Sequence, residues 1–155
     1  MEFTKKEAFL RQIAEYLREN RLTEAYDLSK DFVNKFPDEA VAHYTLGRAS
    51  LMTERLEEAK TAARKAFNLA NGPEDVLTCA ILAASVYYRT GEYAKGYEIL
   101  KGAEKGWKTD ELERLLIIFS LEMKERETAL THFKELLQLN EKMAQELLAR
   151  YTPPA

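Results

Sequence analysis

Apolar residues recur at three- and four-residue spacing along most of the chain. The clearest stretches run from Val41 to Met52 and from Leu56 to Leu69, with a short polar segment between them. This spacing places apolar side chains on one face of an α-helix. The pattern therefore predicts two amphipathic helices joined by a tight turn, which is a helical hairpin.

The same pattern occurs four times. A small residue stands at equivalent places, Ala25, Ala59, Gly96 and Ala129, with steps of 34, 37 and 33 residues. Self-similarity near 34 residues is typical of stacked helical hairpins rather than of a globule. We expect each small residue to lie where the helices of a hairpin cross, because a larger side chain would push their axes apart.

Breaks in the pattern delimit the repeats. Pro37 prevents a helix from continuing, Gly91 can close a helix in the left-handed conformation, and Pro153 and Pro154 stop the last helix. A chain of this length suits a single domain. We expect one domain over residues 1–155, with repeats at about 6–39, 40–73, 77–109 and 110–143 and a capping helix at about 142–151.

These repeats resemble the tetratricopeptide repeat (TPR) family over about residues 6–143. The family motif combines an aromatic, Leu-Gly and Tyr in the first helix with Ala, an aromatic, Ala and Pro in the second. The chain departs from it at Ser50, where Tyr is usual, and at Gly96, where Ala is usual. The matching positions are Phe9, Tyr16, Ala25 and Pro37, then Leu46, Gly47, Ala59 and Ala66, then Tyr87, Gly91, Tyr93 and Ala103, then Ala129 and Phe133.

The resemblance implies an all-α fold, a right-handed α-solenoid of about four helix-turn-helix repeats with a C-terminal capping helix. No hairpin can bury its own apolar face, so large side chains should fill the gaps between hairpins. Leu147, Leu148 and Tyr151 should cover the fourth repeat. The segment Leu115–Leu121 is apolar on nearly every side, so it is either enclosed by neighbouring helices or presented to a partner. The expected core residues are Phe9, Tyr16, Phe32, Leu46, Phe67, Tyr87, Tyr93, Leu100, Phe133 and Leu136.

The resemblance also implies that the first helices of the repeats line a concave side. In the second repeat, spacing places a further stripe of side chains on the first helix, and the repeat steps carry this stripe to the other repeats. The predicted peptide groove comprises Leu10, Ala14, Leu17, Arg18, Val41, Tyr44, Arg48, Leu51, Met52, Ile81, Ser85, Tyr88, Arg89, Arg114 and Ile118.

This stripe is apolar and carries four arginines, and Arg and Tyr are enriched in binding hot spots. Arg can also hold a carboxylate through two parallel hydrogen bonds. Our hypothesis is that the groove takes a short peptide or helix with apolar anchors and acidic groups. The alternative is that the arginines only solvate an exposed face and that the aliphatic side chains are ordinary core, namely Leu10, Leu17, Leu51 and Ile118.

One TPR subclass binds the C-terminal EEVD tails of heat-shock chaperones through Lys, Asn and Arg side chains. None of the matching positions here carries the needed group, and a frame shifted by one repeat also fails. We therefore do not expect the EEVD chaperone tail as a ligand. The matching positions are Leu10, Ala14, Thr45, Thr78 and Leu82.

Charge and hydropathy argue against nucleic acid and a lipid bilayer as binding partners. The net charge is −3, so there is no basic excess for nucleic acid. The longest nearly apolar run, Val76 to Tyr88, is too short to insert across a bilayer. The N-terminus has no apolar signal core, and a single cysteine fits a reducing compartment, so we expect a cytoplasmic protein.

Candidate chemistry is sparse, and we expect no catalytic residue, no metal and no cofactor. Cys79 has no neighbouring base and should be a small buried hydrophobe. His43 and His132 are distant in sequence and should be packing or surface residues without metal-ligand spacing. Trp107 is expected to pack, or to offer a second contact point if exposed. The carboxylates should serve helix dipoles and solubility, among them Glu57, Glu58, Glu111, Glu113, Glu125 and Glu127.

The sequence therefore predicts a protein that is not an enzyme. Stacked hairpins present an open curved surface rather than an enclosed site. We expect a protein–protein interaction scaffold or adaptor that binds a peptide or helix of a partner. The alternatives are a self-assembly module, with the Leu115–Leu121 helix or an open solenoid end as the contact, and a chaperone that shields an apolar segment of a client.

Overall fold

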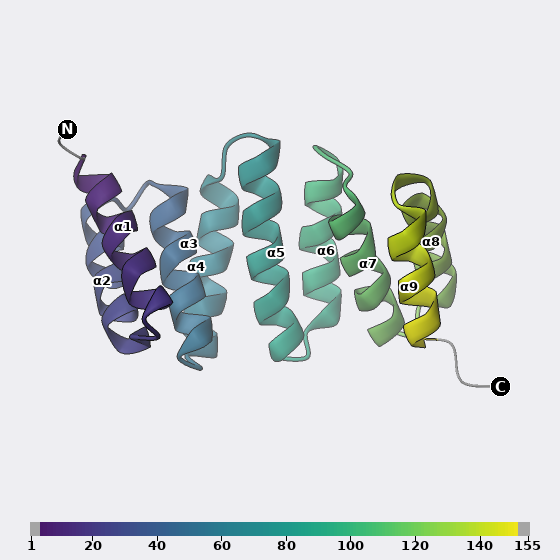
Figure 1. Cartoon of the computed structure of the whole chain (residues 1–155), viewed down its shortest axis with the longest axis horizontal. Helices are drawn as coiled ribbons and strands as arrows, with labels where there is room; N and C mark the ends of the chain where they lie inside the picture. The colour runs from purple at the N-terminus through teal and green to yellow at the C-terminus, as the bar shows by residue number, and fades with distance from the viewer. Residues whose placement is uncertain (1–3, 152–155) are drawn as a thin grey trace.

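The computed structural model describes residues 4–151, which form nine α-helices and no strand. Figure 1 shows the helices in sequence order along the long axis, from purple α1 at one end to yellow α9 at the other. The two prolines expected to stop the final helix, Pro153 and Pro154, lie outside the described residues. The helices are α1 (Lys5–Arg18), α2 (Leu22–Lys35), α3 (Ala40–Met52), α4 (Leu56–Leu69), α5 (Pro73–Arg89), α6 (Tyr93–Glu104), α7 (Asp110–Glu122), α8 (Arg126–Leu139) and α9 (Glu141–Tyr151).

The helices form four antiparallel hairpins, α1–α2, α3–α4, α5–α6 and α7–α8, with α9 packed on α8. From α3 onward, first helices of successive hairpins also touch, because α3 contacts α5 and α5 contacts α7, and the capping helix α9 contacts α7. No comparable contact joins α2 to α4, α4 to α6 or α6 to α8 within residues 4–151. Elements on the inside of a curved stack lie closer together, so α3, α5, α7 and α9 line the inner side.

Small residues allow the paired helices to approach closely. Ala25 and Ala59 are fully buried. A Cβ added to Gly47 would lie 3.2 Å from the backbone nitrogen of Ala63, which shows how closely α3 and α4 pack. A Cβ added to Gly96 would lie 3.1–3.3 Å from three ring atoms of Phe119. The aromatic ring from α7 therefore occupies the space that the usual alanine would take.

Every core cluster joins a hairpin to the next element of the stack. One joins Ile13 of α1 and Phe32 of α2 to Ala42 of α3, with Phe9 stacked on Phe32 at a ring-centroid distance of 5.0 Å. The others join α4 to α5, α5 and α6 to α7, and α7 and α8 to α9. Of the expected core residues, four are buried and the other six are half-buried. The buried ones are Phe32, Tyr87, Leu100 and Leu136.

The apolar segment of α7 is largely enclosed, since Leu116, Ile117 and Phe119 are at most 4% exposed. The expectation for α9 is right only in part. Leu147 is buried against α8 with Ala144, but Leu148 and Tyr151 are 53% and 47% exposed. Residues 144 and 147 share one helical face, whereas residue 148 is rotated by about 100° from residue 147.

The four hairpin turns have the same geometry. Asn20, Glu54, Gly91 and Lys124 each have a positive φ, between 58° and 75°. In each turn the next residue donates its N–H to the carbonyl five residues earlier, at 2.8 Å. This is the Schellman arrangement, which satisfies carbonyl groups left open at a helix end. The turns are separated by the same numbers of residues as the small residues are, so the same Schellman turn closes every hairpin.

Exchanging glycine and non-glycine residues at these turns tests their conformation. A Cβ added at Gly91 meets no atom within 4 Å, so Gly91→Ala changes only the backbone preference. We expect it to lower the free energy of unfolding by about 1 kcal/mol. Lys124→Gly should raise that free energy by a smaller amount, because glycine also loosens the unfolded chain. Urea unfolding followed by circular dichroism measures both; equal stabilities would contradict the turn geometry.

Candidate functional site

A pocket of about 410 Å³ opens on the inner side between α3, α5, α7 and α9. The repeat geometry builds it, because each of these four helices contributes side chains from its inner face. Six residues of the predicted groove meet here: Leu51, Ile81, Ser85, Tyr88, Arg89 and Ile118. The pocket also includes Ala84, Leu115, Phe119 and Tyr151, which are absent from the predicted groove.

The other predicted groove residues lie outside this pocket. Leu10, Leu17 and Val41 are half-buried and pack against the core at the N-terminal end. Tyr44 packs against the cluster between α4 and α5. The exposed ones are Ala14, Arg18, Arg48 and Met52, while Arg114 is half-buried.

One of the missed pocket residues could have been found from the sequence. Leu115 precedes Ile118 by three residues and therefore shares its helical face. Tyr151 could not have been found in this way, because α9 has no counterpart among the repeats. Its side chain reaches the pocket from the end of the stack.

Three of the four groove arginines are already paired. Arg18 pairs with Glu15, Arg89 with Glu54, and Arg114 with Glu111. The hydrogen bond from Arg89 lowers the pKa of the Glu54 carboxyl. No ion pair to Arg48 is found within residues 4–151, and its side chain is exposed. Arg48 lies one turn before Leu51 on α3, so it brings an uncompensated positive charge near the pocket.

Tyr88 forms part of the pocket wall and is held in place from two sides. Its ring lies 5.4 Å from the ring of Tyr93 and 5.6 Å from that of Phe119, centroid to centroid. Its hydroxyl donates to Glu122 at 3.2 Å. Burial, together with the charge of Glu122, raises the pKa of the phenol. Tyr88 is nevertheless 41% exposed, so an oriented aromatic surface is available to a ligand.

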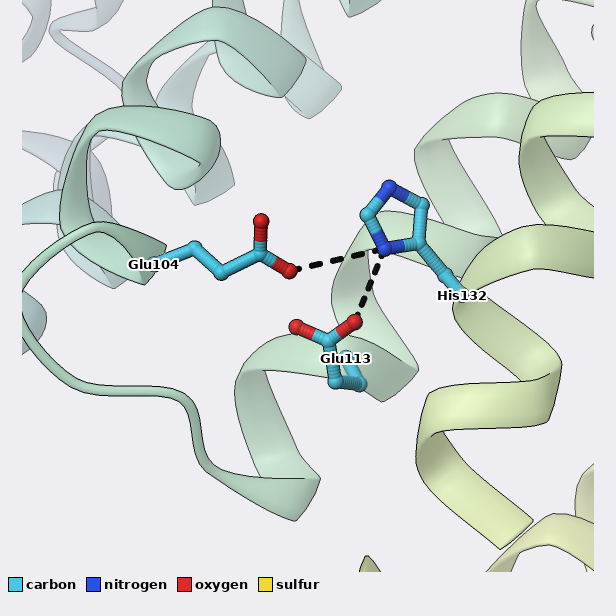
Figure 2. Close-up of side chains that lie close together, drawn as sticks. All are labelled: Glu104, Glu113 and His132. Carbon is cyan, nitrogen blue, oxygen red and sulfur yellow. Dashed lines mark hydrogen bonds and ion pairs between the residues drawn. The ribbon is translucent and has the colours of Figure 1, made fainter. Parts of the chain in front are cut away.

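A second polar feature is buried between α6, α7 and α8 (Figure 2). Nδ1 of His132 lies 2.8 Å from Oε1 of Glu113 and 3.6 Å from Oε2 of Glu104. The hydroxyl of Tyr97 lies 2.9 Å from Nε2 of the same imidazole. On the outer edge, Nζ of Lys101 lies 2.6 Å from Oε1 of Glu104.

This cluster corrects two expectations from the sequence. Glu113, expected as a solvated carboxylate, is fully buried. Metal-ligand spacing was expected to be absent, but Glu104, Glu113 and His132 place possible ligand atoms within 4.8 Å of one another. The three residues come from three different helices, so their proximity depends on helix packing and leaves no linear motif.

Burial and hydrogen bonding move the pKa values of the two carboxyl groups in opposite directions. Burial raises the pKa of Glu113. Burial also opposes ionisation of Glu104, but hydrogen bonds with Glu113 and Lys101 outweigh this effect and lower its pKa. No N–H or O–H group of residues 4–151 donates to Oε2 of Glu113.

The remaining candidates have structural roles. Cys79 is buried, as predicted, and burial together with the charge of Asp75 raises the pKa of its thiol to about 11. His43 is 9% exposed, and its Nε2 lies 2.7 Å from the carbonyl of Pro37. Trp107 is 46% exposed on the connection between α6 and α7. Within residues 4–151 no helix has the length and apolar character needed to cross a membrane.

Comparison with known proteins gives the fold. No family model and no curated protein matches the chain. A crystal structure of MamA is 23% identical, with a TM-score of 0.78 over 91% of this chain and 81% of that chain. A thermophilic TPR protein from Thermus thermophilus is 21% identical, with a TM-score of 0.73 over 96% and 80%. The TPR2B domain of yeast Sti1, solved in a complex with pHsp70, is 19% identical, with a TM-score of 0.66 over 76% and 98%.

Burial of Cys79 gives a chemical prediction. The thiolate is the reactive form of cysteine, and the raised pKa keeps the thiol protonated near neutral pH. We expect a thiol-specific reagent at about pH 8 to label the folded chain on the order of 100-fold more slowly than the urea-unfolded chain. Absorbance of the released chromophore follows the reaction. Equal rates in the two states would show that Cys79 is accessible.

Proposed function

Because residues 4–151 have the TPR fold, we propose that this chain is a non-catalytic scaffold or adaptor that holds a segment of a partner protein against its inner side. The observation that carries the proposal is the pocket built jointly by α3, α5, α7 and α9. Its volume falls within the range of about 300–1,000 Å³ that is typical of ligand sites. An inner groove of this kind suits a peptide or a helix with an apolar anchor. We expect this function to be carried out in the cytoplasm.

The chemistry of the pocket supports a particular kind of segment. Ile81, Leu115 and Ile118 offer aliphatic contacts, and Tyr88 offers a fixed aromatic surface. Arg48 and Arg89 lie on the neighbouring helices α3 and α5 and can attract a carboxylate. The segment should therefore carry a large apolar side chain flanked by an acidic residue. The Sti1 domain was solved with pHsp70, but an EEVD chaperone tail is not expected here, because the matching positions lack the required Lys, Asn and Arg side chains.

Self-assembly is a second candidate, favoured by a specific observation. Four leucines near the C-terminal end of the stack are between 38% and 53% exposed, and such side chains can form an interface between copies. Analytical ultracentrifugation over a range of concentrations separates the two functions, because an adaptor for peptides stays monomeric. Shielding of an apolar client segment, as by a chaperone, would use the inner pocket and not this end. The four leucines are Leu130, Leu137, Leu139 and Leu148.

Filling the pocket tests the adaptor proposal. Ser85 is exposed in the pocket, and its hydroxyl donates to the Ile81 carbonyl within its own helix, at 2.8 Å. Peptides are first selected from a random display library on the wild-type chain. Ser85→Trp should then weaken the selected peptides more than tenfold, as measured by fluorescence anisotropy.

Thr131→Trp is the matched control, because Thr131 is exposed on α8 and makes the same kind of intrahelical bond, to Glu127 at 3.1 Å. Its affinity for the selected peptides should equal that of the wild type. Peptides that bind Ser85→Trp as well as the wild type, or a library that yields no binder, would count against the inner pocket.

The arginines provide a separate test of the charge requirement. The double variant Arg48→Ala/Arg89→Ala should weaken an acidic groove ligand by more than tenfold, which corresponds to about 1.4 kcal/mol. Arg89 is already paired with Glu54, so the single variant Arg48→Ala should account for most of the loss. Titrations at low and high salt should show a smaller salt dependence for both variants. An unchanged affinity in the double variant would show that the bound segment needs no acidic residue.

A further inference from the structure

The buried cluster of Glu104, Glu113 and His132 is separate from the pocket, since none of the three lines it. We propose that these three side chains form a binding site for one divalent cation of the zinc class, with Nδ1 of His132 and one oxygen from each carboxylate as ligands. The site ties α6, α7 and α8 together and is independent of what the inner side binds. Figure 2 shows both carboxylates directed toward the same nitrogen of the imidazole, Nδ1.

The spacing of the donor atoms suits such an ion. Zinc binds imidazole nitrogen and carboxylate oxygen at about 2.0–2.2 Å, so neighbouring ligand atoms of a tetrahedral site lie about 3.4 Å apart. The distances from Nδ1 to the two carboxylate oxygens are 2.8 and 3.6 Å, which bracket this value. All three donor atoms lie within 4.8 Å of one another. Small rotations of the side chains bring them to coordinating positions.

An unsatisfied oxygen indicates that the protein's own groups do not complete the cluster. Oε2 of Glu113 is buried and accepts no hydrogen bond within residues 4–151, and the whole side chain is 0% exposed. Buried carboxylate oxygens without a partner are rare, because leaving water costs free energy that only a donor or a cation offsets. A cation between the carboxylates would give this oxygen its partner.

Charge balance favours a doubly charged cation. Two ionised carboxylates and a neutral imidazole carry a charge of −2, which one divalent ion cancels. Lys101 compensates Glu104 from the edge of the cluster, and Lys108 pairs with Glu135 at 3.1 Å, but no Lys or Arg of residues 4–151 pairs with Glu113. Metal ligands bind in their deprotonated forms, so both carboxylates and Nδ1 carry no proton when the ion is bound.

The second nitrogen of the imidazole is already positioned for this role. With Nδ1 on the metal, Nε2 carries the proton and donates it to the hydroxyl of Tyr97 at 2.9 Å. A partner of this kind orients a metal-bound histidine and fixes its tautomer. Tyr97 is therefore a positioning residue. Calcium and magnesium fit less well, because they require six or more oxygen ligands.

The experiment uses the untagged chain, stripped of metal with a chelator and dialysed. Zinc chloride is titrated by calorimetry, and the melting temperature is recorded by circular dichroism with zinc, with magnesium and without metal. We expect one zinc ion per chain and a higher melting temperature with zinc alone.

Variants locate the ion. His132→Gln and Glu113→Gln each remove a ligand and should weaken zinc binding by about 100-fold or more, and Tyr97→Phe by about tenfold. His43→Gln removes the other histidine and Glu98→Gln removes an exposed carboxylate of α6, so both should bind like the wild type. Wild-type chain that binds no zinc, or His132→Gln that binds it unchanged, would overturn the proposal.

A spectroscopic measurement keeps the test decisive if a variant fails to fold. Cobalt(II) replaces zinc and reports its coordination through its visible absorption. The wild-type chain should give the intense bands of a four- or five-coordinate site, and zinc should displace them. A weak spectrum like that of cobalt in water would show that the cluster is only an internal hydrogen-bond network.

Discussion

The close approach of paired helices is the constraint on which the rest of this structure depends. Ala25 and Ala59 are fully buried, and Gly96 leaves room for an aromatic ring from the next hairpin. Because the helices of a hairpin lie so near each other, their large side chains point outward along the stack, toward neighbouring hairpins. Each core cluster then joins a hairpin to the next element of the stack, as the clusters around Phe32 and Leu116 show.

Stacking also divides the polar and apolar chemistry between two regions. Helices α3, α5, α7 and α9 touch in succession along the inner side and leave an apolar pocket there. The buried polar cluster lies instead where α6, α7 and α8 meet. Helix α7 contributes to both, with Ile118 in the pocket and Glu113 in the cluster. A ligand in the pocket and a ligand in the polar cluster would therefore contact different sides of the same helix, α7.

Much of the fold could be predicted from the sequence, because it depends on local rules. Three- and four-residue spacing identifies the helices, and the small residue in each repeat gives the period. The left-handed turn at Gly91 follows from its residue type, but the same turn at Glu54 and Lys124 does not, since those residues adopt it only because the hairpin requires it. Spacing also found six of the ten residues that line the pocket.

What could not be predicted depends on contacts between distant segments. From the sequence alone, Glu113 is a favourable charge in the first turn of a helix. Only the packing of α8 shows that it is buried against His132. The pairing of Arg89 with Glu54 joins two hairpins and leaves no trace in either local sequence. The place of Tyr151 in the pocket likewise follows from how α9 closes the stack.

Packing between near neighbours along the chain has a kinetic consequence. The substantial helix contacts of residues 4–151 join adjacent or next-neighbour helices, so the contact order is low. Chains of this kind fold fast, because little loop entropy is lost before contacts form. Folding can nucleate in any hairpin pair and propagate outward, and α1, which packs mainly on α2, can fray while the rest of the stack stays intact.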